Sequence, residues 1–152
     1  MTAIGHRVQL SRAECQRLLA SVPFGRVVFT SGALPAVRLA CHLADGERIV
    51  IHASLGNAVS PGPDGTSPVV AYEADQVDAS GRSGWSVVVV GRASLVTDQK
   101  LAARYRESLG PAWFDDPASQ VITLTPELVS GYLMEPVLTG AATVADPPAV
   151  AR

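Results

Sequence analysis

The sequence of 152 residues has little charge, few aromatic side chains and little cysteine. Charged residues make up 17% and aromatic residues 5%, and 14 acidic residues face 12 Lys plus Arg. No cluster of Lys or Arg would attract nucleic acid or an anionic membrane, so we expect neither partner. No apolar run approaches the roughly 20 residues of a membrane-spanning helix, and none near the N-terminus has signal-peptide length. We therefore expect a cytoplasmic protein.

Motifs for catalysis and metal binding are also missing. The chain has no nucleophile elbow, no glycine-rich phosphate loop and no cysteines paired at metal-binding spacing. We expect Cys15 and Cys41 to be small buried hydrophobes rather than a disulfide. Cys41 and His42 are neighbours on a predicted strand and point to opposite faces, so they cannot share one ion. No metal site is predicted.

The hydrophobic content of 47% is enough to build one folded domain. We assign this domain to residues 1–138. Residues 139–152 are mostly small and show no apolar period that would dock them, so they are expected to form a frayed tail.

Two segments show helical periodicity between clear start and stop signals. Ser11 and Glu14 have the spacing of a capping box, and the helix that they begin should end before Pro23. Asp98 is the predicted cap of a second helix, which continues through Leu109 and ends at Gly110.

Most of the remaining apolar pattern predicts strands. The segments are 26–30, 34–43, 48–53, 69–74, 84–91, 121–124 and 132–137. Short strands, closely spaced turns and only two helices favour an antiparallel barrel over a βαβ sheet. Residues 54–68 are rich in Gly, Pro and Ser and are predicted to form a long irregular loop.

The segment 34–43 alternates between apolar and other side chains. We expect Arg38 and His42 to be exposed and the intervening side chains to pack, namely Val37, Leu39, Cys41 and Leu43. Asp45-Gly46 should form the turn to segment 48–53.

The expected register of this hairpin sets Arg38 opposite Ala53 and His52 opposite Leu39. On the next strand, Glu73 and Asp75 share one face, and we expect Asp75 to lie in a solvated turn rather than in an acid–base pair.

Several short motifs resemble one known family. They are Gly25-Arg26-Val27, Leu34-Pro35-Ala36-Val37 and, most specifically, Ser83-Gly84-Trp85-Ser86-Val87 continuing into Val90-Gly91-Arg92-Ala93. Between roughly Leu10 and Leu133 the chain resembles the pyridoxamine 5'-phosphate oxidase-like proteins. The resemblance implies a six-stranded split barrel that forms a homodimer and holds flavin mononucleotide (FMN) in a groove between subunits. Relatives also bind deazaflavin, and some oxidise or reduce small molecules.

The resemblance also implies a set of cofactor-binding residues. Arg38 matches a family arginine directed at the cofactor phosphate, which suits the donor fork of guanidinium. Ala53, through its main chain, and Ser54 match the positions beside that phosphate. Asn57 stands where the family has a basic residue, and His52 where many close relatives have an arginine. Two cations of the family pattern are therefore absent.

A second part of the implied site is the strand that runs along the flavin ring. Ser86 matches a hydrogen-bonding position there, and Trp85 points to the opposite face, toward the core or a partner subunit. Trp113 and Phe114 are expected at a lid or dimer interface. Simpler alternatives are a solvated Arg38 and an ordinary strand residue at His52.

Two functions remain open on the sequence alone. One is an FMN-dependent oxidoreductase that acts on a small molecule, with catalytic residues that the sequence does not identify. The other is a split barrel that has lost the phosphate site, because Asn57 and Ala58 carry no charge, and that binds deazaflavin, a tetrapyrrole or no cofactor.

Overall fold

The computed structural model describes residues 5–110 and 117–136. The predicted tail at residues 139–152 and the aromatic residues Trp113 and Phe114 lie outside these ranges. Within them, neither α-helix has the length and apolar character needed to cross a membrane.

The described residues form seven strands, two α-helices and one 3-10 helix. In chain order these are β1 (Gly5–Gln9), α1 (Arg12–Ala20), β2 (Phe24–Ser31), β3 (Leu34–Asp45), β4 (Arg48–Ala53), η1 (Gly56–Val59), β5 (Val69–Val77), β6 (Gly84–Leu95), α2 (Gln99–Leu109) and β7 (Gln120–Pro136). The mainly β composition with two α-helices confirms the predicted fold class.

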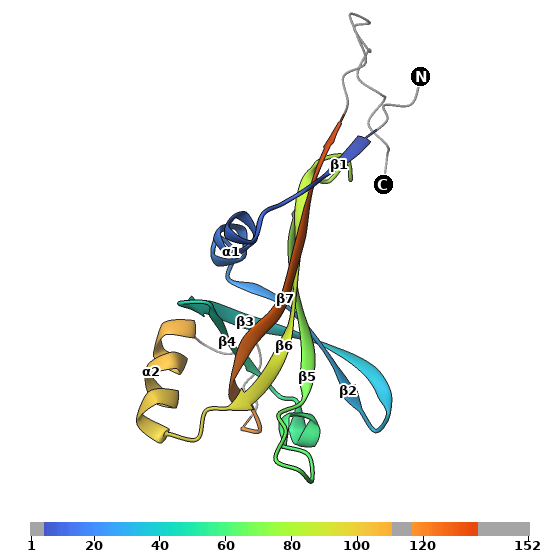
Figure 1. The fold of residues 1–152 in the computed structure, drawn as a ribbon. Helices are drawn as coiled ribbons and strands as arrows, with labels where there is room; N and C mark the ends of the chain where they lie inside the picture. The colour runs from blue at the N-terminus through green and yellow to red at the C-terminus, as the bar shows by residue number, and fades with distance from the viewer. Residues whose placement is uncertain (1–4, 111–116, 137–152) are drawn as a thin grey trace, which may run out of the picture.

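All strand pairs are antiparallel, and six strands close into a barrel. The order is β1-β7-β4-β3-β2-β5-β6, and a further pairing of β6 with β7 closes the ring. Strand β1 lies outside the ring along the far end of β7 (Figure 1). Both helices lie on one side of the barrel, away from β2 and β5 (Figure 1).

Both predicted helix starts are confirmed. The Ser11 hydroxyl accepts a hydrogen bond from the Glu14 amide at 3.2 Å, and the Glu14 carboxylate accepts one from the Ser11 amide at 3.3 Å. The Asp98 carboxylate accepts from two amides in the first turn of α2. These caps use donors that a helix end leaves without an intrahelical partner, so they form from local sequence.

The last strand, β7, is longer than the sequence predicts. The segments 121–124 and 132–137 are parts of one strand, Gln120–Pro136, with a register shift at Val90 and Gly91 of its partner β6. A Cβ at Gly91 would overlap the Thr125 carbonyl oxygen, so glycine allows the two strands to approach there. Strand β1, which was not predicted, pairs with the far end of β7.

The prediction for the faces of β3 is wrong. His42 is 6% exposed inside the barrel, whereas Val37 is 54% and Leu39 47% exposed. Apolar alternation marked the strand but did not identify its inner face.

Hydrogen bonds explain why His42 can be buried. Its Nε2 lies 2.7 Å from the Leu19 carbonyl, which can only accept, so Nε2 carries the proton. Nδ1 then accepts from the Tyr72 hydroxyl at 2.6 Å, which is the shorter of two contacts of that hydroxyl, the other being to the Ala40 carbonyl at 3.1 Å. Burial lowers the pKa of His42, which keeps the ring neutral, and both ring nitrogens are paired. This network joins the end of α1 to the barrel interior.

The predicted hairpin register is also wrong, by two residues. Asp45 pairs with Arg48, and His52 lies opposite Cys41 rather than Leu39. The turn is Gly46-Glu47, with Gly46 at φ +62°, rather than Asp45-Gly46, and moving a two-residue turn by one position changes the register by two residues. A shift of two residues preserves the face of every side chain while changing its neighbours.

Candidate functional site

One side of the barrel carries a continuous apolar row on its outside. The strand registers place side chains of five strands next to one another, in the order Val37, Val28, Ala71, Val90 and Leu128. Val37 and Leu128 are the most exposed members, at 54% and 62%. Contiguous apolar surface of this kind marks binding sites more often than ordinary surface.

A charged cluster lies in the adjacent row. That row runs through Leu39, Arg26, Glu73, Val88 and Ser130. We call the two rows together the outer sheet face. The Arg26 guanidinium donates to the Glu73 carboxylate at 2.8 Å and to the Asp75 carboxylate at 3.0 Å. The Arg26 guanidinium thus forms ion pairs with two carboxylates.

The protonation of Glu73 depends on its surroundings. Burial and the neighbouring Asp75 carboxyl raise the pKa of Glu73 to about 7, although Arg26 opposes the shift. Asp75 therefore lies in β5 and in an ion pair, not in the solvated turn expected from the sequence. The cluster can hold a proton near neutral pH.

Arg38 lies on β3 with its guanidinium exposed. It donates to the Val37 carbonyl at 3.0 Å and lies 5.7 Å from the centre of the Phe29 ring. Among the described residues, no carboxylate forms an ion pair with it. The guanidinium lies near an aromatic ring, and its donor fork remains available to an anion.

His52 is half-buried on β4, beside the connection that leads into β7. Its Nε2 lies 2.8 Å from the Ser119 hydroxyl, while Nδ1 is buried without a hydrogen-bond partner among the described residues. Burial, and secondarily the charge of Arg106 on α2, lowers the pKa of His52. The ring therefore supplies no positive charge at neutral pH.

The other residues implied near the phosphate follow directly along the chain. Ala53 is buried in the core, Ser54 is half-buried and Asn57 is exposed on η1. Gln120 holds this segment in place because its amide oxygen accepts from the Leu55 amide at 3.0 Å. The loop predicted at residues 54–68 is thus irregular apart from η1, and it is anchored to β7.

Trp85 and Ser86 lie on β6 and point to opposite faces, as expected for adjacent strand residues. Trp85 is 6% exposed and belongs to the main core, whereas Ser86 is half-buried on the outside, between Asp75 of β5 and Tyr132 of β7. The placement of Trp85 is that of a packing residue.

The structure does not place all the implied residues on one face. His52 lies opposite Cys41 and shares its face, while Arg38 is three positions from Cys41 and so points to the other face. The contact of Arg38 with Phe29, a core residue, agrees with this assignment. Arg38 and His52 can therefore reach the same ligand only around the edge of the β2–β3 hairpin.

The residue that sequence reasoning missed is Arg26. The motif Gly25-Arg26-Val27 gave it no role, yet its guanidinium binds both carboxylates of β5. The i, i+2 spacing of Glu73 and Asp75 was a usable signal because it places two carboxylates on one strand face. Their cation could not be named without the pairing of β2 with β5.

Comparison with known proteins places this geometry in a family. The model of the family described as pyridoxamine 5'-phosphate oxidase matches residues 11–133. An uncharacterized protein of Mycobacterium tuberculosis is 45% identical over 128 residues, which cover 82% of this chain and 83% of that protein.

Two solved structures share the fold. An FAD-binding protein from Mesorhizobium loti superposes with a TM-score of 0.65 at 20% identity, covering 86% of this chain and 98% of that one. The FAD binding protein from Mycobacterium smegmatis gives a TM-score of 0.60 at 23% identity, covering 84% and 98%. The barrel described above is the split barrel of flavin-binding proteins, and the chain belongs to the pyridoxamine 5'-phosphate oxidase family.

Proposed function

We propose that this protein is a homodimeric flavoprotein that binds FMN and oxidises or reduces a small molecule. Its family and its flavin-binding structural neighbours support the cofactor class. The observation that carries the proposal is the Arg38 guanidinium, which is exposed, lies 5.7 Å from the centre of the Phe29 ring and has no acidic partner among the described residues. An arginine held in this way is suited to a phosphate.

The residues present fit a flavin phosphate through one strong contact and several weaker ones. Arg38 would supply charge-assisted hydrogen bonds, and the Ser54 hydroxyl and Asn57 amide would supply neutral ones. With a neutral His52 and a neutral Asn57, Arg38 is the only cation in this set, so we expect moderate rather than tight binding.

The apolar row supports the homodimer. Val37 and Leu128 lie at its two ends, and the row crosses five strands without a charged side chain. A second copy of the same face would remove this surface from water, which favours association at roughly 25 cal/mol per Å² of apolar area. Burial between two copies would also provide a dry wall for a planar ring.

A bound flavin would supply the redox chemistry, because its ring system accepts and donates hydride. The chain's own contribution is to bind the phosphate through Arg38, to offer the Ser86 hydroxyl as a hydrogen-bonding group and to exclude water with the apolar row.

Titration with FMN tests this function. We expect the purified protein to bind FMN, with quenching of flavin fluorescence, and Arg38→Ala to weaken binding about 10- to 100-fold, since a charge-assisted hydrogen bond is worth about 1.5–3 kcal/mol. Arg82→Ala, at an exposed loop position, is the matched control and should bind as the wild type does. Equal affinities of the Arg38 and Arg82 variants would remove Arg38 from the site.

A parallel titration with deazaflavin addresses the alternative cofactor. The neutral Asn57 at a position where the family carries a base is the observation that favours it. Binding of deazaflavin with no uptake of FMN would replace the proposed cofactor. Failure to bind either would overturn the flavoprotein assignment while leaving the family and the fold unchanged.

A further inference from the structure

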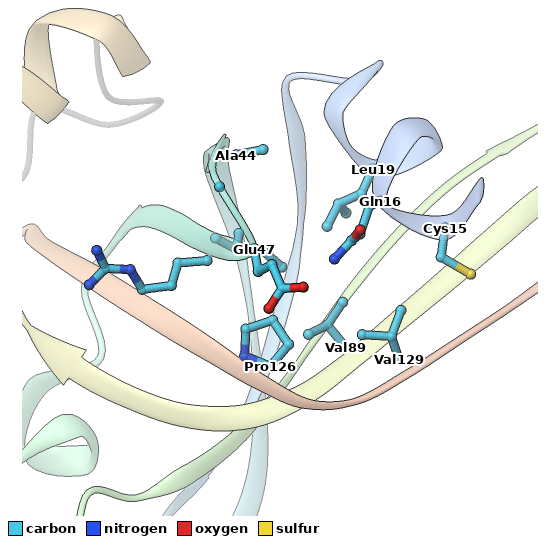
Figure 2. Close-up of a pocket in the computed structure, with 11 residues that line it drawn as sticks. Cys15, Gln16, Leu19, Ala44, Glu47, Val89, Pro126 and Val129 are labelled. Atoms are coloured by element: carbon cyan, nitrogen blue, oxygen red, sulfur yellow. The ribbon is translucent and has the colours of Figure 1, made fainter. Parts of the chain in front are cut away.

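The two sides of the barrel are covered to different extents. On the helix side, α1 and the β3–β4 turn enclose a pocket of about 50 Å³, lined by Gln16, Leu19 and residues of β6 and β7 (Figure 2). This volume is well below the roughly 300–1,000 Å³ of sites that hold drug-sized ligands. On the opposite side, the outer sheet face leaves Val37, Leu39 and Leu128 between 47% and 62% exposed. The outer sheet face is therefore the side on which apolar surface remains for a partner.

A second copy that covers the apolar row also covers the charged row beside it. Stable protein interfaces bury about 800 Å² of each partner, which is more than five partly exposed side chains of one row provide. The charged row lies two residues further along each strand, about 7 Å away, and it begins with the exposed Leu39. The cluster of Arg26, Glu73 and Asp75 thus falls within the interface of the proposed dimer.

The charge of this cluster depends on one proton. The Arg26 guanidinium lies 2.8 Å from the Glu73 carboxylate and 3.0 Å from the Asp75 carboxylate, so one positive charge faces two acids. With both acids ionised the cluster is negative by one charge, and with one of them protonated it is neutral. The three side chains are 41%, 23% and 32% exposed, and a second copy would remove the water that still reaches them. Because a charge that loses water without gaining a partner is unfavourable, the dimer favours the neutral cluster.

The strands on either side of β5 bring one further ion pair. On β2 the charged side chain is Arg26, and on β6 it is Arg92. Arg92 lies on the other side of the apolar row from Glu73, and it already binds Glu127 at 3.1 Å. On β5 itself, Tyr72 is buried inside the barrel. These groups do not offset the extra negative charge of the cluster.

Further across the sheet, Tyr132 of β7 lies beside Ser86 of β6. The Arg7 guanidinium of β1 lies 4.1 Å from the centre of the Tyr132 ring, three strands away from Asp75. Burial and the neighbouring Asp75 carboxyl raise the pKa of Glu73 to about 7. Glu73 is therefore the group of the cluster that takes up a proton near neutral pH.

We infer that the Arg26, Glu73 and Asp75 cluster makes the association of two copies depend on pH: the copies associate when the cluster is neutral and separate when both carboxylates are ionised. This inference rests on the homodimer of the proposed function. The proton passes from solvent to a Glu73 carboxylate oxygen as the interface closes, and it returns to solvent as the interface opens.

Sedimentation velocity of the full chain as purified, over a range of concentrations at pH 6 and at pH 8, tests this dependence. At pH 8, one unit above its pKa, about one-tenth of Glu73 keeps its proton. The dissociation constant of the dimer should therefore rise about 10-fold for each Glu73 that must be protonated, and about 100-fold if both copies must be. The slope of log Kd against pH counts the protons taken up.

Two variants should remove the pH dependence. Glu73→Gln and Asp75→Asn each leave a single carboxylate for Arg26, so the cluster is neutral at pH 8 without a bound proton. In each variant, the dissociation constants at pH 6 and pH 8 should agree within about three-fold. Glu107→Gln, at an exposed position of α2 on the helix side, is the matched control and should show the wild-type rise. If Glu73→Gln does not fold, Asp75→Asn provides the same test.

The results separate this inference from the dimer itself. A wild-type dimer with the same dissociation constant at pH 6 and pH 8 would overturn the pH control and leave the dimer in place. A rise that persists in Glu73→Gln would also overturn it, because the response would then belong to another group, such as one of the three histidines. A wild-type chain that is monomeric at both pH values would overturn the proposed homodimer and this inference with it.

Discussion

Polar groups are paired differently in the interior network at His42 and on the outer sheet face. Inside the barrel, one imidazole is paired at both nitrogens, with Leu19 and Tyr72 of the same chain. On the outer sheet face, Arg26 is shared by two carboxylates, and it lies beside apolar side chains that remain exposed.

One chain completes the hydrogen bonding and apolar burial of the barrel interior, but it leaves the outer sheet face partly exposed. The interior satisfies its hydrogen bonds and buries its apolar atoms, so its residues serve the stability of the fold. The outer sheet face leaves apolar area in contact with water and holds an acid whose pKa is displaced to about 7. Substitutions in the interior should therefore affect folding. Substitutions on the outer sheet face should affect association and the pH response.

The largest expected effect is on the free energy of unfolding, and it comes from substituting Gly25 of β2. A Cβ there would overlap the Glu73 carbonyl oxygen and lie 2.8 Å from the Tyr72 hydroxyl, so β2 would have to move away from β5. We expect Gly25→Val to lower the free energy of unfolding by about 3 kcal/mol or more, measured by urea denaturation. Gly62→Val, in an exposed loop, should change it by less than about 0.5 kcal/mol. Similar losses in both variants would contradict the packing argument.

A charge in the apolar row should break association rather than folding. We expect Val37→Glu to raise the dissociation constant of the proposed dimer at least 100-fold, equivalent to about 2.7 kcal/mol, because a carboxylate would be buried without a partner. Sedimentation velocity over a range of concentrations measures this. Leu95→Glu, at the far end of β6, is the control and should leave the dimer intact. A wild-type protein that sediments as a monomer would remove the dimer from the proposal.

Removing one hydroxyl should test the interior network alone. In Tyr72→Phe, the Nδ1 atom of His42 loses its donor in a buried site, which we expect to lower the free energy of unfolding by about 1–2 kcal/mol. The comparison variant is Tyr105→Phe, whose hydroxyl donates to the exposed Asp45 carboxylate at 2.6 Å, and its loss should be smaller. Equal urea midpoints for wild type and Tyr72→Phe would show that the His42 contact contributes nothing to stability.

The smallest expected effect is the pH response of the outer sheet face. Because the pKa of Glu73 is raised from 4.5 to about 7, folding favours its protonated form, and this contribution is complete below about pH 4.5 and lost as the pH rises through 7. Relative to Glu73→Gln, the wild type should lose about 1 kcal/mol between pH 5 and 7.5, less than the full shift implies because solvent reaches the cluster.

Urea denaturation at the two pH values measures this difference. Glu127→Gln, which removes an exposed partner of Arg92, should follow the wild-type pH profile. A wild-type profile parallel to that of Glu73→Gln would show that Glu73 titrates at its ordinary pKa.

The parts of the fold that were predictable depend on residues close together in the chain. Ser11 with Glu14, and Asp98 with the amides that follow it, form caps within three residues, and both helix starts were predicted. The identity of Arg38 as an anion-binding candidate was also accessible from its motif, and the structure leaves its guanidinium available. Whether it binds a phosphate stays a prediction.

The parts that were not predictable depend on which strand lies beside which. Strand β1 and the middle of β7 have weak apolar patterns and are held by their partners, so the pattern alone did not reveal them. The position of His52 opposite Cys41 rather than Leu39 follows from a register that a two-residue turn sets. The pairing of Arg26 with Glu73 joins residues 47 positions apart.

The sequence by itself determined the helix caps, the β-rich class and the motifs of the family, because each rests on short-range spacing. Only the tertiary structure decided that His42 is inside and Val37 outside, that two acids share Arg26, and that Gln16 faces a pocket. The physical reason is that burial and charge pairing are properties of neighbours in space, and in a closed barrel those neighbours come from distant strands.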